Sequence, residues 1–181
     1  MKNGGKVCTL ADLGEIVGGA TPSTKNADYY GGDIAWITPK DLSVFQGRYI
    51  GRGERNITVE GLQNSSARIM PPHSVLFTSR APIGYVAISK NEVCTNQGFK
   101  SIVPNSDTDD LFLYYLLIYN RERIKNMGSG TTFKEVSGSV MKRIDVVVPS
   151  GKLEQQMIAN TLSVFDDKIE NNTKINHNLA V

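Results

Sequence analysis

The chain has 181 residues, 40% of them hydrophobic, and a net charge of +2, which allows one compact domain with an appendage. It contains no run of eighteen apolar residues and begins with six mostly polar residues, so we expect neither a transmembrane helix nor a signal peptide. The two cysteines, Cys8 and Cys94, are far apart and predict reduced thiols in a cytoplasmic protein rather than a disulfide framework.

The small net charge hides an uneven distribution along the chain. Residues 40–100 hold eight Lys or Arg against four Asp or Glu, and residues 111–152 hold seven against three. The tail from residue 153 onward has a net charge of −2. This asymmetry favours an anionic partner for the part of the chain that precedes the tail.

The first half of the chain reads as one short helix followed by short strands. Helical spacing of Leu10, Leu13 and Ile16 predicts a helix over Thr9–Val17, and a polar loop follows over residues 21–26. Runs of β-branched and aromatic residues between Gly, Pro, Asn and Asp predict strands at Ile34–Thr38, Val75–Thr78, Tyr85–Ile88 and Lys100–Val103. Their uneven spacing indicates a curved, irregular and mostly antiparallel sheet.

The second half mixes helices with one strand. A helix is expected over Leu111–Met127, capped by Asp109 or Asp110 and stopped by Gly128. A polar loop follows over residues 128–132, and a helical turn opens at Ser137. A buried strand is then expected at Ile144–Val148, before Pro149. The fold class is therefore α+β, with a β-rich body over residues 1–150.

Residues 151–181 have the character of a coiled-coil arm. From residue 153 onward there is no Gly or Pro, and apolar residues recur in steps of four and three, as in a heptad repeat. The expected seam, which two asparagines interrupt, consists of Ile158, Leu162, Phe165, Ile169, Asn172, Asn176 and Leu179. Buried Asn in such a seam fixes register and partner choice at some expense of stability, so this helix is expected to pair with another helix. The alternative is a helix packed on its own body.

The patterns of common active sites are absent from this sequence. There is no phosphate-binding loop with its lysine, and neither histidine has metal-ligating neighbours at ligand spacing. His73 beside Pro71-Pro72 is interpreted as a turn residue, and Asp166-Asp167-Lys168 as a solvated flank of the arm rather than half of a nuclease site. We therefore predict no catalytic residue and no metal site.

Three segments together carry a resemblance to a known family. They run through Gly19-Ala20-Thr21-Pro22-Ser23 and Tyr29-Tyr30-Gly31-Gly32-Asp33-Ile34-Ala35-Trp36-Ile37, then through Thr78-Ser79-Arg80-Ala81-Pro82-Ile83-Gly84-Tyr85-Val86-Ala87-Ile88 and Cys94-Thr95-Asn96-Gln97-Gly98-Phe99-Lys100, and finally through Glu154-Gln155-Gln156-Met157-Ile158-Ala159 and Asn171-Asn172-Thr173-Lys174-Ile175-Asn176. In this order they resemble the specificity subunit of type I restriction–modification enzymes.

The resemblance implies a function and partners. The family subunit has two DNA target-recognition domains, each followed by a long helix, and the paired helices set the distance between two half-sites on double-stranded DNA. It has no active site; it binds methyltransferase subunits that carry S-adenosylmethionine, and a restriction subunit, with Mg and ATP, joins for cleavage. This chain matches a single recognition domain with one helix, so we expect a half-subunit that forms a homodimer through the seam.

Recognition of DNA would need side chains of two kinds. Cations that contact phosphates position the protein, and here we predict Lys40, Arg52, Arg55, Arg80 and Lys100. Polar side chains of loops read base edges, and here we predict Thr21, Ser23, Lys25, Asn26, Ser79, Ser129, Thr131, Thr132 and Lys134. Asn96 and Gln97 lie in a segment typical of the family and are expected to have structural roles.

Two alternatives stay open at this point. The chain could be the specificity fragment of a single-chain methyltransferase–nuclease, or a coiled-coil scaffold whose basic body binds an acidic protein. DNA affinity that falls steeply with salt would separate the DNA readings from the scaffold.

Overall fold

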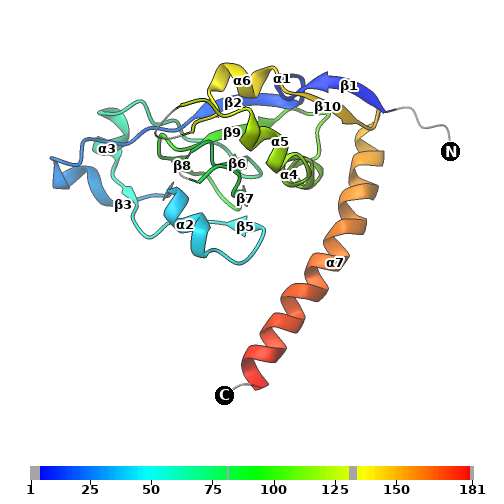
Figure 1. The fold of residues 1–181 in the computed structure, drawn as a ribbon. Helices are drawn as coiled ribbons and strands as arrows, with labels where there is room; N and C mark the ends of the chain where they lie inside the picture. The colour runs from blue at the N-terminus through cyan, green and yellow to red at the C-terminus, as the bar shows by residue number, and fades with distance from the viewer. Residues whose placement is uncertain (1–4, 81, 131–133, 180–181) are drawn as a thin grey trace.

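The computed structural model describes residues 5–80, 82–130 and 134–179, without the side chains of residues 174 and 177–179, and shows an α+β body from which a long helix extends (Figure 1). The strands are β1 (Lys6–Thr9), β2 (Gly14–Gly18), β3 (Tyr30–Ile34), β4 (Trp36–Ile37), β5 (Tyr49–Ile50), β6 (Val75–Phe77), β7 (Val86–Ser89), β8 (Cys94–Thr95), β9 (Lys100–Pro104) and β10 (Asp145–Val148). The helices are α1 (Leu10–Leu13), the 3-10 helix η1 (Ala27–Tyr29), α2 (Pro39–Val44), α3 (Val59–Gln63), α4 (Asp110–Tyr119), α5 (Arg121–Asn126), α6 (Gly138–Lys142) and α7 (Lys152–Leu179).

The main sheet has five strands in the order β2-β9-β6-β7-β5. Its neighbours are antiparallel except β5 and β7, which are parallel. Two further pairs flank it: β4 with β8, which are parallel, and β1 with β10, which are antiparallel. The irregular, mostly antiparallel sheet expected from the sequence is confirmed, and β6, β7 and β9 fall on three of the four predicted strands. The prediction at residues 34–38 is too long, because β3 ends at Ile34 and β4 covers only Trp36–Ile37.

The helix predicted over Thr9–Val17 is wrong beyond Leu13. Residues 14–18 form β2, which pairs along its whole length with β9. Gly14 marks the change, because its backbone is extended and a Cβ there would lie 2.2 Å from the carbonyl oxygen of Val103. The leucines at helical spacing are both buried, so the apolar spacing marks the core correctly but not the end of the helix.

The helix predicted over Leu111–Met127 is two helices, α4 and α5. They meet at Asn120, whose side-chain amide donates to the carbonyl oxygen of Leu116 at 2.9 Å. The predicted cap is confirmed, since the Asp109 carboxylate accepts from the N–H of Phe112 at 2.8 Å. The helical turn at Ser137 is also confirmed: this residue caps α6.

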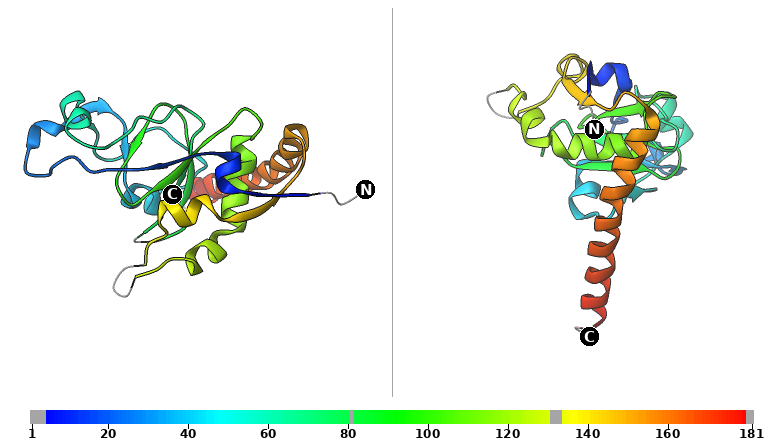
Figure 2. Two further views of the ribbon diagram at one scale, coloured as in Figure 1. Left: turned by 90° about the horizontal axis from the view of Figure 1, so that it is seen from above. Right: turned by 90° about the vertical axis from the view of Figure 1, so that its right-hand side faces the viewer.

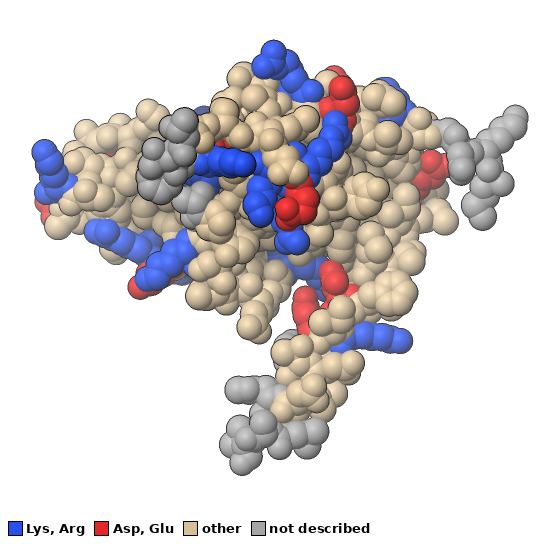
Figure 3. Space-filling model, viewed as in Figure 1, with Lys and Arg blue, Asp and Glu red and all other residues tan. Residues whose placement is uncertain are grey.

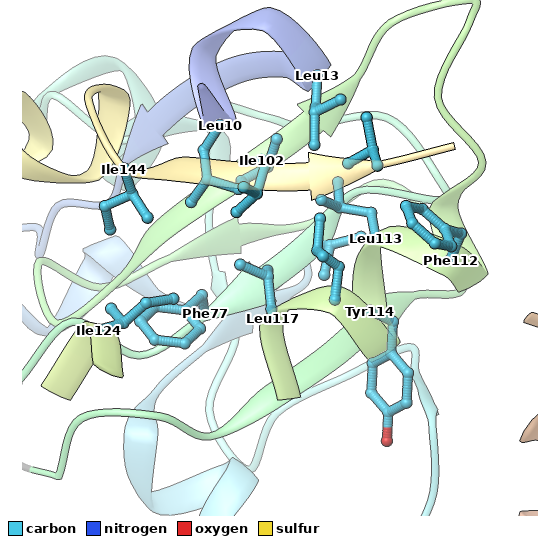
Figure 4. Close-up of a cluster of buried hydrophobic side chains, with 14 of the residues drawn as sticks. Leu10, Leu13, Phe77, Ile102, Phe112, Leu113, Tyr114, Leu117, Ile124 and Ile144 are labelled. Atoms are coloured by element: carbon cyan, nitrogen blue, oxygen red, sulfur yellow. The ribbon is translucent and has the colours of Figure 1, made fainter. Parts of the chain in front are cut away.

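The core lies on both faces of the sheet. On one face, α1, α4, α5 and β10 cover the sheet and bury the cluster in Figure 4, which includes Leu10, Phe77, Ile102, Leu117 and Ile144. The hydroxyl of Tyr114 points away from this cluster, and burial raises the pKa of Tyr114 to about 12. The other face packs against a second cluster that includes Ile37, Leu76 and Phe99.

The helix α7 follows β10 and runs past the body, so that its C-terminal end projects from it (Figure 1, Figure 2). At 28 residues it is about 42 Å long. Among the residues that the structure describes, no helix combines the length and apolar character needed to cross a membrane.

Candidate nucleic-acid interface

Hydrogen bonds from its backbone groups to neighbouring segments hold the loop over residues 19–26 in place. The Ala20 N–H donates to the carbonyl oxygen of Thr95 at 2.9 Å, and the Ala20 carbonyl oxygen accepts from the Trp36 indole at 3.0 Å. The Tyr30 hydroxyl donates to the carbonyl oxygen of Pro22 at 2.7 Å. A Cβ at Gly19 would lie 1.9 Å from the Asn96 carbonyl oxygen, so this close approach requires glycine. The loop therefore presents its side chains from a fixed backbone.

Four side chains predicted to read bases belong to this loop. Ser23 and Lys25 are exposed, whereas Thr21 and Asn26 are half-buried. The Thr21 hydroxyl contacts the side-chain oxygen of Gln97, and the Asn26 side chain accepts from the Asp28 N–H at 3.1 Å, where it caps η1. Ser23 and Lys25 are thus the most accessible of the four.

The turn over residues 95–98 lies directly beside the loop. The Asn96 side-chain oxygen accepts from the Gly98 N–H at 2.8 Å, as in an Asx turn. This contact fits the structural role expected for Asn96. Gln97 is exposed, and its partner Thr21 belongs to the loop.

The prediction that Ser79 reads bases is wrong, because Ser79 is fully buried. Its N–H and its hydroxyl both donate to the Gly98 carbonyl oxygen, at 2.8 and 3.2 Å, and its own carbonyl oxygen accepts from the Val136 N–H at 2.9 Å. Ser79 therefore joins the turn at Gly98 to the segment at Val136, and no base edge can reach it.

The remaining predicted readers belong to the segment over residues 129–135. At its two ends, the backbone groups of Ser129 and Glu135 bond reciprocally at 3.1 and 2.9 Å. Ser129 and Lys134 are exposed. Thr131 and Thr132 lie outside the described residues, so their role stays a prediction.

Four of the five cations predicted to contact phosphates pair with carboxylates. Glu135 lies between Arg80 and Lys100, with N–O distances of 3.7 and 3.3 Å. Lys40 pairs with Glu54 at 2.6 Å, and this hydrogen bond raises the pKa of Lys40. Arg52 lies 3.9 Å from Asp33.

The exposure of these cations differs widely. The side chains of Lys40 and Arg52 are 74% and 62% exposed, whereas Arg80 is 34% and Lys100 only 17% exposed. Lys100 can therefore offer little more than its ammonium group to a partner. All five stay predictions as phosphate contacts.

Arg55 is held in a different manner. Its guanidinium lies 3.6 Å from the centre of the Tyr30 ring, and Tyr30 meets Trp36 edge to face at 5.8 Å. Among the described residues, no carboxylate lies within ion-pair distance of Arg55, in contrast to the other four cations.

The loop over residues 19–26 and Ser79 thus both hydrogen-bond to the turn over residues 95–98, and Glu135 pairs with Arg80 and Lys100. Lys and Arg side chains are spread over the visible face of the body in Figure 3, with Asp and Glu side chains among them and on the arm. The arrangement combines fixed backbones, exposed polar side chains and cations, which is what a surface that reads a polyanion requires.

The two thiols and the described histidine do not form reactive sites. Cys8 and Cys94 are free and buried, and burial raises the pKa of Cys94 to about 11, which keeps it protonated. His73 occupies a turn with a φ of 68°, as expected, and its Nδ1 lies 2.8 Å from an Asp110 carboxylate oxygen. Within the described part of the chain, no group of three or more His, Cys, Asp or Glu side chains is placed to hold a metal.

The seam of the arm remains open to solvent. Gln155 and Ala159 face the body and are buried, while the seam residues Ile158, Leu162, Phe165 and Ile169 are 40–62% exposed. Asn172 and Asn176 are exposed as well, and the side chain of Leu179 lies outside the described residues. The body therefore does not cover the apolar stripe.

The interpretation of Asp166-Asp167-Lys168 as a solvated flank is incomplete, because both aspartates contact the body, although the Asp167 side chain stays 55% exposed. The Tyr115 hydroxyl donates to Asp166 at 2.7 Å, and Arg48 forms an ion pair with Asp167. Neither Arg48 nor Tyr115 was predicted from the sequence. The adjacent carboxylates of Asp166 and Asp167 are the sequence signal that could have indicated a cation on the body opposite the arm.

Comparisons with known proteins place this architecture in a family. The sequence profile described as "Type I restriction modification DNA specificity domain" matches residues 3–180. The MjaIX type I restriction enzyme specificity subunit of Methanocaldococcus jannaschii is 51% identical over 92% of this chain and 39% of its own length. The HindI specificity subunit of Haemophilus influenzae is 28% identical over 93% of this chain and 37% of its own length. The chain thus spans about two fifths of these relatives.

Solved structures show the same fold. A chain from a study of assembly and conformational transition of the type I R-M system superposes with a TM-score of 0.78 at 17% identity, over 99% of this chain and 42% of that one. The HsdS subunit from Thermoanaerobacter tengcongensis gives 0.71 at 16% identity, over 97% and 40%. With the family profile covering nearly every residue, this chain belongs to the type I restriction–modification DNA specificity family.

Proposed function

We propose that this chain is a sequence-specificity unit of a type I restriction–modification enzyme, which recognises one half of a bipartite DNA target and has no catalytic residues of its own. The observation that carries the proposal is the fixed backbone of the loop over residues 19–26, which hydrogen-bonds to Thr95 and presents the exposed side chains of Ser23 and Lys25. Ser129 and Lys134 are exposed as well, on a segment that the neighbouring Val136 joins to Ser79. Arg and Lys side chains would hold phosphates, and the loop side chains would read base edges.

The proposed partners are a second copy of this unit and the other subunits of the enzyme. The chain matches about 39% of the Methanocaldococcus subunit, and two such units would supply the two recognition domains expected of a whole subunit. The copies would pair through the exposed seam of α7. Methyltransferase subunits with S-adenosylmethionine, and a restriction subunit with Mg and ATP, would supply the chemistry in the cytoplasm.

The test is selection from a pool of random duplex DNA by the chain together with the methyltransferase that co-purifies with it. We expect an enriched sequence whose logarithmic affinity falls linearly with the logarithm of salt between about 50 and 200 mM, because phosphate contacts release counterions. The double variant Lys40→Glu, Arg55→Glu should weaken binding to enriched and scrambled duplexes alike.

Two results would count against this function. One is the absence of any enriched sequence with the methyltransferase present. The other is a DNA affinity that does not change with salt, because binding through phosphates must release counterions.

A further inference from the structure

The arm is attached to the body at two separate levels. Near its start, Lys152 donates to the Ser106 carbonyl oxygen at 2.9 Å, and the Gln155 side-chain oxygen accepts from the Asp109 N–H at 2.9 Å. Three to four turns further along, Asp166, Asp167 and Glu170 contact Arg48 and Tyr115. A single attachment would let a helix swing about that point, whereas two attachments separated along its axis define its direction.

Arg48 is the centre of the second attachment. Its side chain is only 12% exposed; it forms an ion pair with Asp167, and its Nε lies 3.5 Å from a Glu170 carboxylate oxygen. Its Nη1 donates to the Tyr115 hydroxyl at 3.5 Å, and that hydroxyl donates in turn to Asp166. One guanidinium therefore links two residues of the arm directly and a third through α4. Its planar fork suits this geometry better than the ammonium of a lysine would.

The backbone of Arg48 is as firmly placed as its side chain. Its carbonyl oxygen accepts from the Ile88 N–H at 2.7 Å, and it directly precedes β5, the edge strand of the main sheet. The backbone that carries the guanidinium is thus hydrogen-bonded to the main sheet. Through Arg48, the arm is joined to this sheet.

The chemistry of the contact favours a persistent link. Burial disfavours the charge of Arg48, but hydrogen bonds with Asp167 and Tyr115 outweigh it and raise the pKa of Arg48. Burial, and then the hydrogen bond to Asp166, raise the pKa of Tyr115, so its hydroxyl keeps its proton at neutral pH. Partly buried charge pairs are also screened less by salt than surface pairs.

A small change of angle at this contact is magnified along the arm. From Lys152 to Asn171 the helix extends about 29 Å, so a tilt of about 10° moves its far part by about 5 Å. Residues 171–173, 175 and 176 are exposed, which is consistent with a free distal segment.

We propose that Arg48 is a positioning residue that sets the direction of the arm relative to the body. Where the proposed function holds, this direction also sets the spacing between two DNA half-sites. The first statement concerns the chain alone, and the second rests on the proposed function.

The direction of the arm can be measured by distance measurements between two spin labels. Labels at Val44→Cys on α2 and Asn171→Cys on the arm report body-to-arm distance, in a chain whose Cys8 and Cys94 are replaced by alanine and which is diluted with unlabelled chain. Val44 and Asn171 are exposed, so labels there disturb no packing. We expect Arg48→Met to broaden the distance distribution or to shift it by about 5 Å, the displacement estimated from helix geometry.

A second variant distinguishes loss of the Arg48 contact from a general loss of stability of the body. Asp167→Asn combined with Glu170→Gln changes only side chains of the arm that are 55% and 38% exposed, and it should change the distances in the same way. The matched control is Arg68→Met, which removes the exposed ion pair with Glu15 at 2.6 Å and should leave the distances unchanged. Unchanged distances in both Arg48→Met and the arm variant, or an equal change in the control, would overturn the proposal.

The second statement, that the direction of the arm sets the spacing between half-sites, is tested on duplexes whose two half-sites are separated by increasing spacers. The parent chain should prefer one spacing, and Arg48→Met should bind neighbouring spacings with less than about a threefold difference. A parent chain that shows no sequence preference with the co-purifying methyltransferase present would refute the proposed function, while the distance measurement would still decide whether Arg48 positions the arm. Distances that change with an unaltered spacing preference would refute the link to spacing.

Discussion

Glu135, whose backbone pairs with Ser129, lies between Arg80 and Lys100. A carboxylate in this place holds two cations in defined positions, but it also occupies the site that a phosphate oxygen would take. Any phosphate that binds there must compete with it. Such a residue lowers general affinity for polyanions while it keeps the cations in place for a well-fitted partner.

Replacing Glu135 by glutamine should therefore strengthen binding to DNA of any sequence. We expect an increase of about three- to tenfold at low salt and a steeper dependence on salt, by about one in the slope of log affinity against log salt, since each phosphate neutralised contributes about that much. Fluorescence anisotropy with an enriched duplex and a scrambled one measures both quantities.

Glu92→Gln is the matched control for this variant, because it makes the same change of net charge at an exposed residue in the turn between β7 and β8. An equal gain in both variants would show that only overall charge matters. Weaker binding of Glu135→Gln would mean that the carboxylate is needed to position the cations.

The candidate interface was predictable from sequence only to the level of loops. Ser23 and Lys25 lie exposed in a polar loop, as their composition indicates. Ser79 has the same chemical character and is fully buried, because its partners, Gly98 and Val136, come from distant parts of the chain. No local pattern distinguishes a serine that reads a ligand from one that joins two loops.

At the level of elements, the sequence predicted the features that depend on residues close together in the chain, such as helix caps. Asp109 and Ser137 cap helices because their side chains reach backbone groups three residues away. The strands β5 and β8 have two residues each, and both exist through parallel pairing with strands far away in sequence. Such short strands carry no period of their own, so the sequence analysis missed β5 and β8.

In contrast to these short strands, the arm has a strong seven-residue period, and its seam is exposed in the folded chain. If α7 pairs with a second copy, Phe165→Glu should convert a dimer into a monomer, because it would place two carboxylates in an apolar contact. Since Phe165 is 61% exposed in the single chain, the melting temperature of the body should change little. Sedimentation velocity at micromolar concentration measures the first effect and calorimetry the second.

Val164→Glu provides the comparison, because Val164 is 53% exposed and points about 100° away from Phe165 around the helix. This variant should remain dimeric. A parent chain that sediments as a monomer would contradict pairing through the arm, and equal dissociation of both variants would place the contact elsewhere on the helix.

At the scale of the whole molecule, an assembly of two identical chains has consequences for what it can read. A closed dimer with two-fold symmetry presents the same recognition loops twice in opposite orientation. Its preferred DNA should therefore be an inverted repeat with an unread spacer between the two halves. Sequencing the duplexes retained from a random pool tests this, and a single site without internal symmetry would contradict it.

The ladder between β1 and β10 joins the two ends of the body, with Lys6 opposite Val148. On a ribosome, the first strand is made early but has to wait for its partner until nearly the whole body has been translated. Contacts between residues so far apart close large loops and form slowly. The same ladder ends four residues before α7 starts. The arm therefore leaves the ribosome only after the strand that completes this ladder, and its exposed apolar stripe follows a body whose strands have all been synthesised.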